Sequence, residues 1–129
     1  MNYLLLDTAT PVCRVSIIKN DSKLDYEWQA DRTLAHGLLS HLTGLLSEND
    51  LTLDDLNGIG ALRGPGSFTG LRIGLTVLNT IADSQNIPIV GADGDDWQRV
   101  ALDRLETGEN DQIVLPLYGR DARITSPRK

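Results

Sequence analysis

A glycine-rich turn between two regular stretches constrains the fold of this chain more than any other feature. Residues 63–70 read Arg-Gly-Pro-Gly-Ser-Phe-Thr-Gly. The apolar run before them, residues 56–62, is typical of a strand, and residues 71–82 after them have the apolar spacing of a helix. The glycines permit a positive φ or a close backbone approach, and the proline between them has a fixed φ. The pattern predicts a strand, a sharp turn and a helix in direct succession.

The turn is also a candidate ligand site. Ser67 and Thr69 can each cap the following helix, and the free N–H groups of a helix start suit an anion. Two known motifs do not fit, because a P-loop needs a lysine that the turn lacks and the spacing from Gly66 to Gly70 is one residue too long for a Rossmann fingerprint. A sharp turn without a ligand is the alternative interpretation. The candidate nucleotide or phosphate loop comprises Asp7, Thr8, Gly64, Gly66, Ser67 and Thr69.

The rest of the chain predicts a single α/β domain. Turn formers at residues 20–22 indicate a hairpin, and Thr33 is a candidate cap for the first long helix. The element order β-β-β-α-β-α-β predicts a five-stranded mixed sheet with helices packed on it. The other predicted strands cover residues 2–7, 12–19, 24–29 and 87–91, the other predicted helices cover 33–48 and 97–106, and 113–118 is a final extended piece.

Composition narrows the classes of function. A chain of 129 residues is expected to form one domain. Its net charge of −6 argues against a free-standing nucleic-acid binder. The single cysteine, Cys13, allows no internal disulfide and fits a reducing cytosol. We see no targeting segment and no apolar run long enough to span a membrane, so we expect a soluble, cytoplasmic protein.

Few residues in the sequence suggest catalysis or metal binding. Asp7 is the last residue of the first predicted strand, where it could serve phosphate and magnesium or simply cap the strand end. His36 and His41 are five residues apart, about 140° around a helix, and cannot share one metal ion. The acidic residues Asp93, Asp95 and Asp96 could hold a hard cation, or Asp95 and Asp96 could mark a helix start. We therefore predict neither a metal site nor catalytic residues.

The two long predicted helices carry more apolar surface than one sheet face requires. Their apolar arcs are about 140° and about 200° wide, whereas a helix on a sheet needs little more than about 100°. Small residues beside these arcs would let another backbone come close. The surplus predicts either packing of the helices on each other or a partner-binding surface. The candidate surface comprises Leu34, Gly37, Leu38, Ser40, His41, Leu42, Gly44, Leu45, Gly70, Ile73, Gly74 and Val77.

Several segments resemble one protein family. The run Arg-Gly-Pro-Gly-Ser-Phe-Thr-Gly-Leu-Arg-Ile-Gly at residues 63–74 resembles the signature of TsaB, and residues 4–10, 87–91 and 116–120 resemble its first strand, its fifth strand and its C-terminal Pro-x-Tyr-x-Arg. The resemblance implies an actin/Hsp70-like, ribonuclease-H-like fold. It places the domain core at residues 1–91 and a packed helix and tail at 92–129. Family members usually have a second domain before that tail, and we expect it to be missing here.

The resemblance also implies a function. TsaB is a non-catalytic subunit that supports TsaD, which transfers a threonylcarbamoyl group to the adenosine 3′ of the tRNA anticodon. A TsaE-like ATPase would be a third partner, and ATP or ADP and magnesium would bind only in the complex. Alone, the chain would form a homodimer, and it would meet tRNA only through the complex. The alternatives are a small phosphotransferase or ATPase that uses Asp7 and the glycine turn, and a glycoprotease-like hydrolase.

The end of the chain is unusually basic. Four of the twelve basic residues lie in the last ten positions. We expect this tail either to be a solubilising end or to lie near RNA or an acidic partner in a complex, where clustered charges act together. The residues are Arg120, Arg123, Arg128 and Lys129.

Overall fold

A mixed five-stranded sheet forms the centre of the protein. The computed structural model describes residues 1–117. The strand order is β3-β2-β1-β4-β5. The first three strands are antiparallel neighbours, and β4 and β5 run parallel to β1. The strands are β1 (Asn2–Asp7), β2 (Val12–Lys19), β3 (Ser22–Gln29), β4 (Gly58–Leu62) and β5 (Ile89–Ala92), and the α-helices are α1 (Leu34–Glu48), α2 (Phe68–Gln85) and α3 (Trp97–Glu106).

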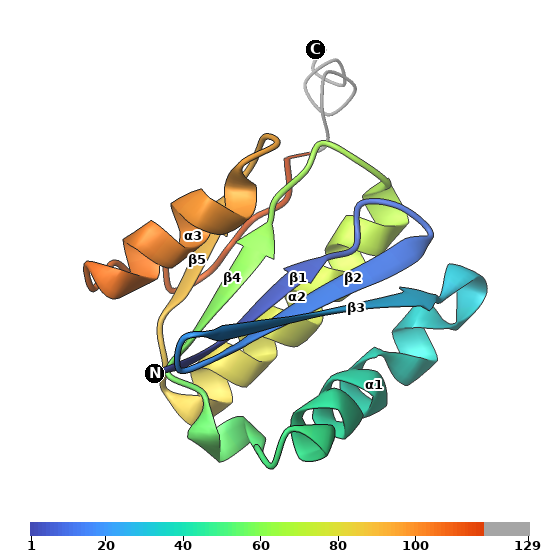
Figure 1. Cartoon of the computed structure of the whole chain (residues 1–129). Helices are drawn as coiled ribbons and strands as arrows, with labels where there is room; N and C mark the ends of the chain where they lie inside the picture. Colours follow the sequence, from blue (N-terminus) through green and yellow to red (C-terminus); the bar gives the residue numbers. More distant parts are fainter. Residues whose placement is uncertain (118–129) are drawn as a thin grey trace, which may run out of the picture.

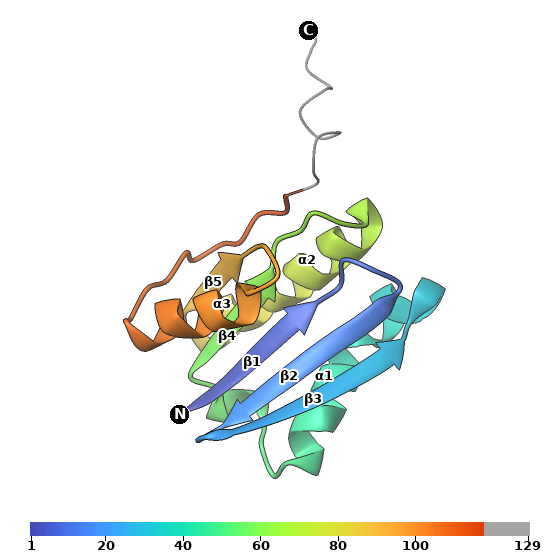
Figure 2. The same cartoon turned by 45° about the horizontal axis from the view of Figure 1, so that its top comes forward.

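The helices cover the two faces of the sheet unequally. In Figure 2, α3 lies in front of the sheet over β4 and β5, while α1 and α2 lie behind it. Successive side chains of a strand point to opposite faces, so Leu4 and Leu6 of β1 pack on the α1–α2 side, whereas Tyr3 and Leu5 pack with α3. The two resulting cores confirm the predicted α/β domain with helices packed on a mixed sheet.

Most predicted elements lie where the sequence places them. The strands β1 and β2 and the helix α3 have the predicted bounds, and α2 is longer than predicted at both ends. Ser67 caps α2, because its Oγ accepts a hydrogen bond from the Gly70 N–H at 3.1 Å. The expected cap at Thr33 is wrong, since its hydroxyl donates to the Ala30 carbonyl instead. Thr69 is likewise no cap and lies in the first turn of α2.

The last described residues follow the sheet without joining it as a strand. Figure 1 shows the segment after α3 returning along β5 towards the end of the sheet where the glycine turn lies. Residues 113–117, predicted as extended, are not assigned to a strand. Tyr118, the basic tail and the last part of the Pro-x-Tyr-x-Arg match lie outside the described residues. Within residues 1–117, no helix combines the length and apolarity needed to cross a bilayer.

Candidate partner-binding groove and glycine turn

The glycines of the turn and of the first two turns of α2 pack directly on the residues that follow β1. A Cβ atom on Gly66 would lie 2.5 Å from the Ala9 Cβ. One on Gly70 would overlap the Thr8 carbonyl oxygen, and one on Gly74 would overlap the Thr8 hydroxyl. Any larger residue at these positions would push α2 away from β1. The glycines therefore fix how closely α2 approaches the sheet.

The polar groups of the turn bind one another across the same contact. The Ser67 N–H donates to the Ala9 carbonyl at 2.8 Å, and the buried Thr8 hydroxyl donates to the Gly70 carbonyl at 2.8 Å. The Asp7 carboxylate accepts a hydrogen bond from the Ala9 N–H at 2.8 Å. These bonds use groups that the candidate phosphate loop would need for a ligand. They favour the alternative interpretation, in which the turn has a structural role.

Gly64 has a separate structural role at the other end of the turn. Its φ of +131° lies in a region that L side chains rarely adopt. A Cβ atom there would also overlap the Leu117 carbonyl oxygen. Only glycine combines this backbone conformation with the close passage of the C-terminal segment. The predicted sharp turn thus depends on Gly64 as well as on the glycines that face β1.

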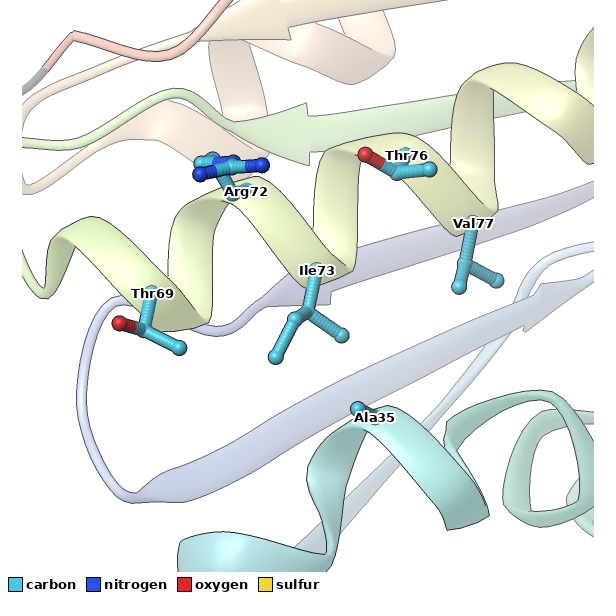
Figure 3. A pocket seen from close by; sticks show the side chains of 6 residues that line it. All are labelled: Ala35, Thr69, Arg72, Ile73, Thr76 and Val77. Carbon is cyan, nitrogen blue, oxygen red and sulfur yellow. The ribbon is translucent and has the colours of Figure 1, made fainter.

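An open groove of about 460 Å³ lies between α1 and α2. Figure 3 shows Ile73 and Val77 pointing from α2 towards α1, where Ala35 faces them. Their half-buried apolar side chains form its floor, and threonines and an arginine form its rim. The Arg72 guanidinium lies 5.5 Å from the centre of the Phe68 ring at the start of α2. The lining residues are Ala35, Thr69, Arg72, Ile73, Thr76 and Val77.

The groove contains only part of the surface predicted from the sequence. Ile73 and Val77 line it. The four predicted leucines of α1 are buried in the core beneath the helix, and Gly70 and Gly74 are buried against Thr8. These six positions are corrected from surface to core, because the apolar arc of α1 faces the sheet and the two glycines of α2 pack on Thr8. The leucines are Leu34, Leu38, Leu42 and Leu45.

The predicted ridge of small residues on α1 lies away from the groove. A Cβ on Gly37 would lie 2.9 Å from the Trp28 ring of β3, so this position faces the edge of the sheet. Ser40 and Gly44 are exposed. Gly44 follows Ala35 by nine residues and therefore points about 180° away from the groove. Ser40 and Gly44 therefore do not line the groove, and their role in partner binding stays a prediction.

The structure adds residues that sequence analysis missed. Ala35, Arg72 and Thr76 line the groove. Leu39 is 50% exposed, although leucine is usually buried. Ala35 and Leu39 are four residues apart and share one side of α1. The spacing of Ala35 and Leu39 was the one feature of the sequence that could have indicated this side of α1. It is hard to recognise, because the leucines of the core lie at neighbouring positions.

His41 packs against the edge of the sheet with an unpaired ring nitrogen. Its ring centre lies 4.6 Å from that of Trp28. Its buried Nε2 has no hydrogen-bond partner among the described residues. Burial lowers the pKa of His41 below its ordinary value, against an opposing effect of the Glu48 carboxylate. The site therefore favours the neutral imidazole, and the predicted role of His41 as a partner contact stays a prediction.

Acidification is expected to destabilise the protein through His41. Below the ordinary histidine pKa of about 6.5, the unfolded chain binds a proton that the folded chain resists, so the free energy of unfolding falls. Urea unfolding at about pH 7.5 and about pH 5.5 should show a larger loss for the native chain than for His41→Phe. His36→Gln, on the exposed side of α1, is the control and should keep the native pH dependence. An identical loss in His41→Phe would contradict this role.

The remaining candidate groups have structural partners or are buried. Asp96 at the start of α3 pairs with Arg99, as expected of a helix start rather than a cation site. The described residues contain no group of three or more potential ligands that could hold a metal ion. Cys13 is buried, and burial raises the pKa of its thiol to about 11, which disfavours the thiolate.

Comparisons with known proteins agree with this architecture. The chain is 33% identical over 92 residues to the tRNA threonylcarbamoyladenosine biosynthesis protein TsaB of Escherichia coli. The match covers 70% of this chain and 39% of that protein. It is 31% identical over 90 residues to TsaB of Bacillus subtilis, covering 69% and 39%. The structure of YeaZ from Pseudomonas aeruginosa matches with a TM-score of 0.67 and 32% identity, covering 71% and 43%.

A family profile decides the assignment. The profile described as TsaD: tRNA N6-adenosine threonylcarbamoyltransferase matches residues 28–94, which is more than half of the chain. The chain belongs to the family of TsaD and TsaB proteins. The resemblance to TsaB predicted from the glycine turn is thereby confirmed. The chain spans about two fifths of the length of the TsaB relatives that it matches.

Proposed function

We propose that this chain is a non-catalytic partner subunit that supports a TsaD-type catalytic subunit in forming threonylcarbamoyladenosine on tRNA. The α1–α2 groove carries the proposal. It combines an apolar floor from Ile73 and Val77 with a rim of threonines and Arg72. A floor of this kind suits the apolar side of a helix from another protein, because helix-in-groove recognition uses spaced apolar anchors.

The glycine turn supports a binding role rather than a catalytic one. Its close contacts with Thr8 and Ala9 hold α2 against β1 and so position one wall of the groove. We propose that nucleotide and magnesium bind to the assembled complex rather than to this chain. A TsaE-like ATPase would join that complex, and tRNA would be reached through it.

In the absence of the catalytic subunit, we propose that two copies of the chain associate through the groove. A two-fold dimer uses the same patch on both copies, and the half-buried floor together with the exposed Leu39 would gain from being covered. The catalytic subunit would then compete with the second copy for this surface. Increasing amounts of TsaD should convert the homodimer into a mixed complex.

The proposal is tested by reconstitution. The purified chain should bind TsaD from the same organism in gel filtration and should not hydrolyse ATP on its own. Expression in Escherichia coli cells depleted of TsaB should restore threonylcarbamoyladenosine in tRNA, measured by mass spectrometry of nucleosides. ATP hydrolysis by the chain alone, together with no binding to TsaD, would favour the phosphotransferase or ATPase alternative.

A further inference from the structure

The helices α1 and α2 carry far fewer charged residues than the rest of the chain. Charged residues make up 23% of the sequence, but Glu48 is the only one in α1, and Arg72 and Asp83 are the only ones in α2. The shorter helix α3, on the other face of the sheet, has four among its 10 residues. Depletion of charge is typical of the centre of a protein–protein interface. The α1–α2 side of the domain therefore has the composition of a surface that another protein covers.

The two ends of this surface differ, because α1 and α2 run parallel. Ala35, near the start of α1, lines the groove together with Thr69, at the start of α2. Ser47, near the end of α1, lines a second hollow together with Gln85, the last residue of α2. The positive ends of the two helix dipoles thus lie together at one end of the surface, and the negative ends lie together at the other.

Two arginines lie at the end where both helices start. Arg72 lines the groove, and Arg32 lines an adjoining hollow of about 200 Å³ that shares Ala35 and Ile73 with the groove. Every other basic side chain within residues 1–117 donates a hydrogen bond or pairs with a carboxylate. Arg32 and Arg72 have no such partner in this part of the chain, although Arg72 stacks on the Phe68 ring. We call these two arginines the cationic end of the groove.

The opposite end of the surface is acidic. Glu48 is the last residue of α1, Asp83 lies in the last turn of α2, and Asp54 lines the hollow between the ends of the two helices. Asp31 is the one carboxylate that lines the hollow at the cationic end, and it already accepts a hydrogen bond from the Gln29 side chain at 2.9 Å. A surface with an apolar centre and ends of opposite charge favours a partner whose charges complement both ends.

We propose that the cationic end selects the partner, and that the groove binds a helix of the TsaD-type subunit with apolar anchors over Ile73 and Val77 and a carboxylate beside Arg72 and Arg32. This inference rests on the proposed function and names the chemistry of the segment that binds. The apolar floor suits any amphipathic helix, whereas a charge at the rim acts on the rate of association and on the choice of partner. A helix with a lysine or arginine at the same place is rejected by repulsion between like charges.

The test reverses one charge of the cationic end and measures binding to TsaD from the same organism. Arg99→Glu is the matched control, because it changes the net charge equally on α3, on the other face of the sheet. Arg72→Lys keeps the charge and separates it from stacking on Phe68. In surface plasmon resonance at low salt, Arg72→Glu should lower the association rate constant about tenfold and weaken its salt dependence. Arg99→Glu and Arg72→Lys should stay within about twofold of the native chain.

A charge exchange identifies the carboxylate on the partner. Each exposed Asp or Glu on the helices of TsaD is replaced by Arg in turn and combined with Arg72→Glu. One of these replacements should restore the association rate with Arg72→Glu and slow association with the native chain. If none of them restores it, the pairing of the cationic end with a carboxylate is wrong.

The outcomes separate this inference from the proposed function. Loss of binding in Ala35→Glu, together with equal rates for Arg72→Glu and Arg99→Glu, would keep the groove and overturn the role of the cationic end. Absence of binding between TsaD and the native chain would overturn the proposed function itself. Slower self-association of Arg72→Glu in analytical ultracentrifugation, with an unchanged rate towards TsaD, would assign the cationic end to a second copy instead. Arg32→Glu replaces Arg72→Glu if circular dichroism shows that the latter does not fold.

Discussion

Replacing Gly70 by alanine is expected to lower the free energy of unfolding by about 1–3 kcal/mol, the usual cost of overpacking a close contact. The added Cβ would overlap the Thr8 carbonyl oxygen, which is backbone and cannot rotate away. Relief requires α2 to move away from β1, which would strain the hydrogen bond from the Thr8 hydroxyl to the Gly70 carbonyl. Urea unfolding followed by circular dichroism measures the change.

Gly44 provides a matched control in the other long helix. A Cβ at this position meets nothing within 4 Å. Gly44→Ala should therefore raise the free energy of unfolding by about 0.5–1 kcal/mol, because alanine loses less backbone entropy than glycine in a helix. The same substitution should thus act in opposite directions at the two sites. A Gly70→Ala protein of native stability that lost nucleotide binding would instead identify the turn as a ligand site.

A negative charge in the α1–α2 groove is expected to abolish binding to TsaD. Ala35 is exposed and lines the groove, so Ala35→Glu leaves the core intact. An interface that covers the groove would remove the new carboxylate from water, at a cost of several kcal/mol. Since each 1.4 kcal/mol is tenfold in affinity, we expect a loss of about a hundredfold or more in isothermal titration calorimetry.

Gly44→Glu is the control for the groove. It places the same charge on the same helix, about 180° away from Ala35, and should keep native affinity. Leu42→Arg is unsuitable for this purpose, because Leu42 is fully buried and a charge there would unfold the domain. Equal binding by Ala35→Glu and the native chain would exclude the groove. Selective loss in Gly44→Glu would move the interface to the opposite side of α1.

The sequence predicts the elements of this fold better than their surfaces. Short apolar runs and turn formers locate β1, β2 and α3 to the residue. The periodicity of α1 shows that its leucines share one face, but it does not show that the sheet occupies that face. The sequence places Gly37 in an open ridge, and it does not show that Trp28, in the strand before α1, packs against this position.

The glycine turn can be predicted from the sequence much better than the contacts of residues 109–117. The turn is local, so its residues predict the break between strand and helix, and only the contacts with Thr8 reveal why each glycine is needed. The contacts of residues 109–117 are not local in the sequence. They depend on which backbone groups of β5 face outwards and on an arginine from α3, and neither can be deduced from residues 109–117 by themselves.

Because α2 packs on Thr8 and Ala9, substitutions on the inner side of α2 and substitutions in the groove have different effects. The contacts that set the distance of α2 from β1 belong to glycines on its inner side, whereas Ile73, Thr76 and Val77 line the groove. Exchanges among the outer residues alter what the groove accepts and leave the helix in place. The turn thus fixes the position of α2. Substitutions of the groove residues can therefore change the specificity for the proposed partner without changing the fold of the domain.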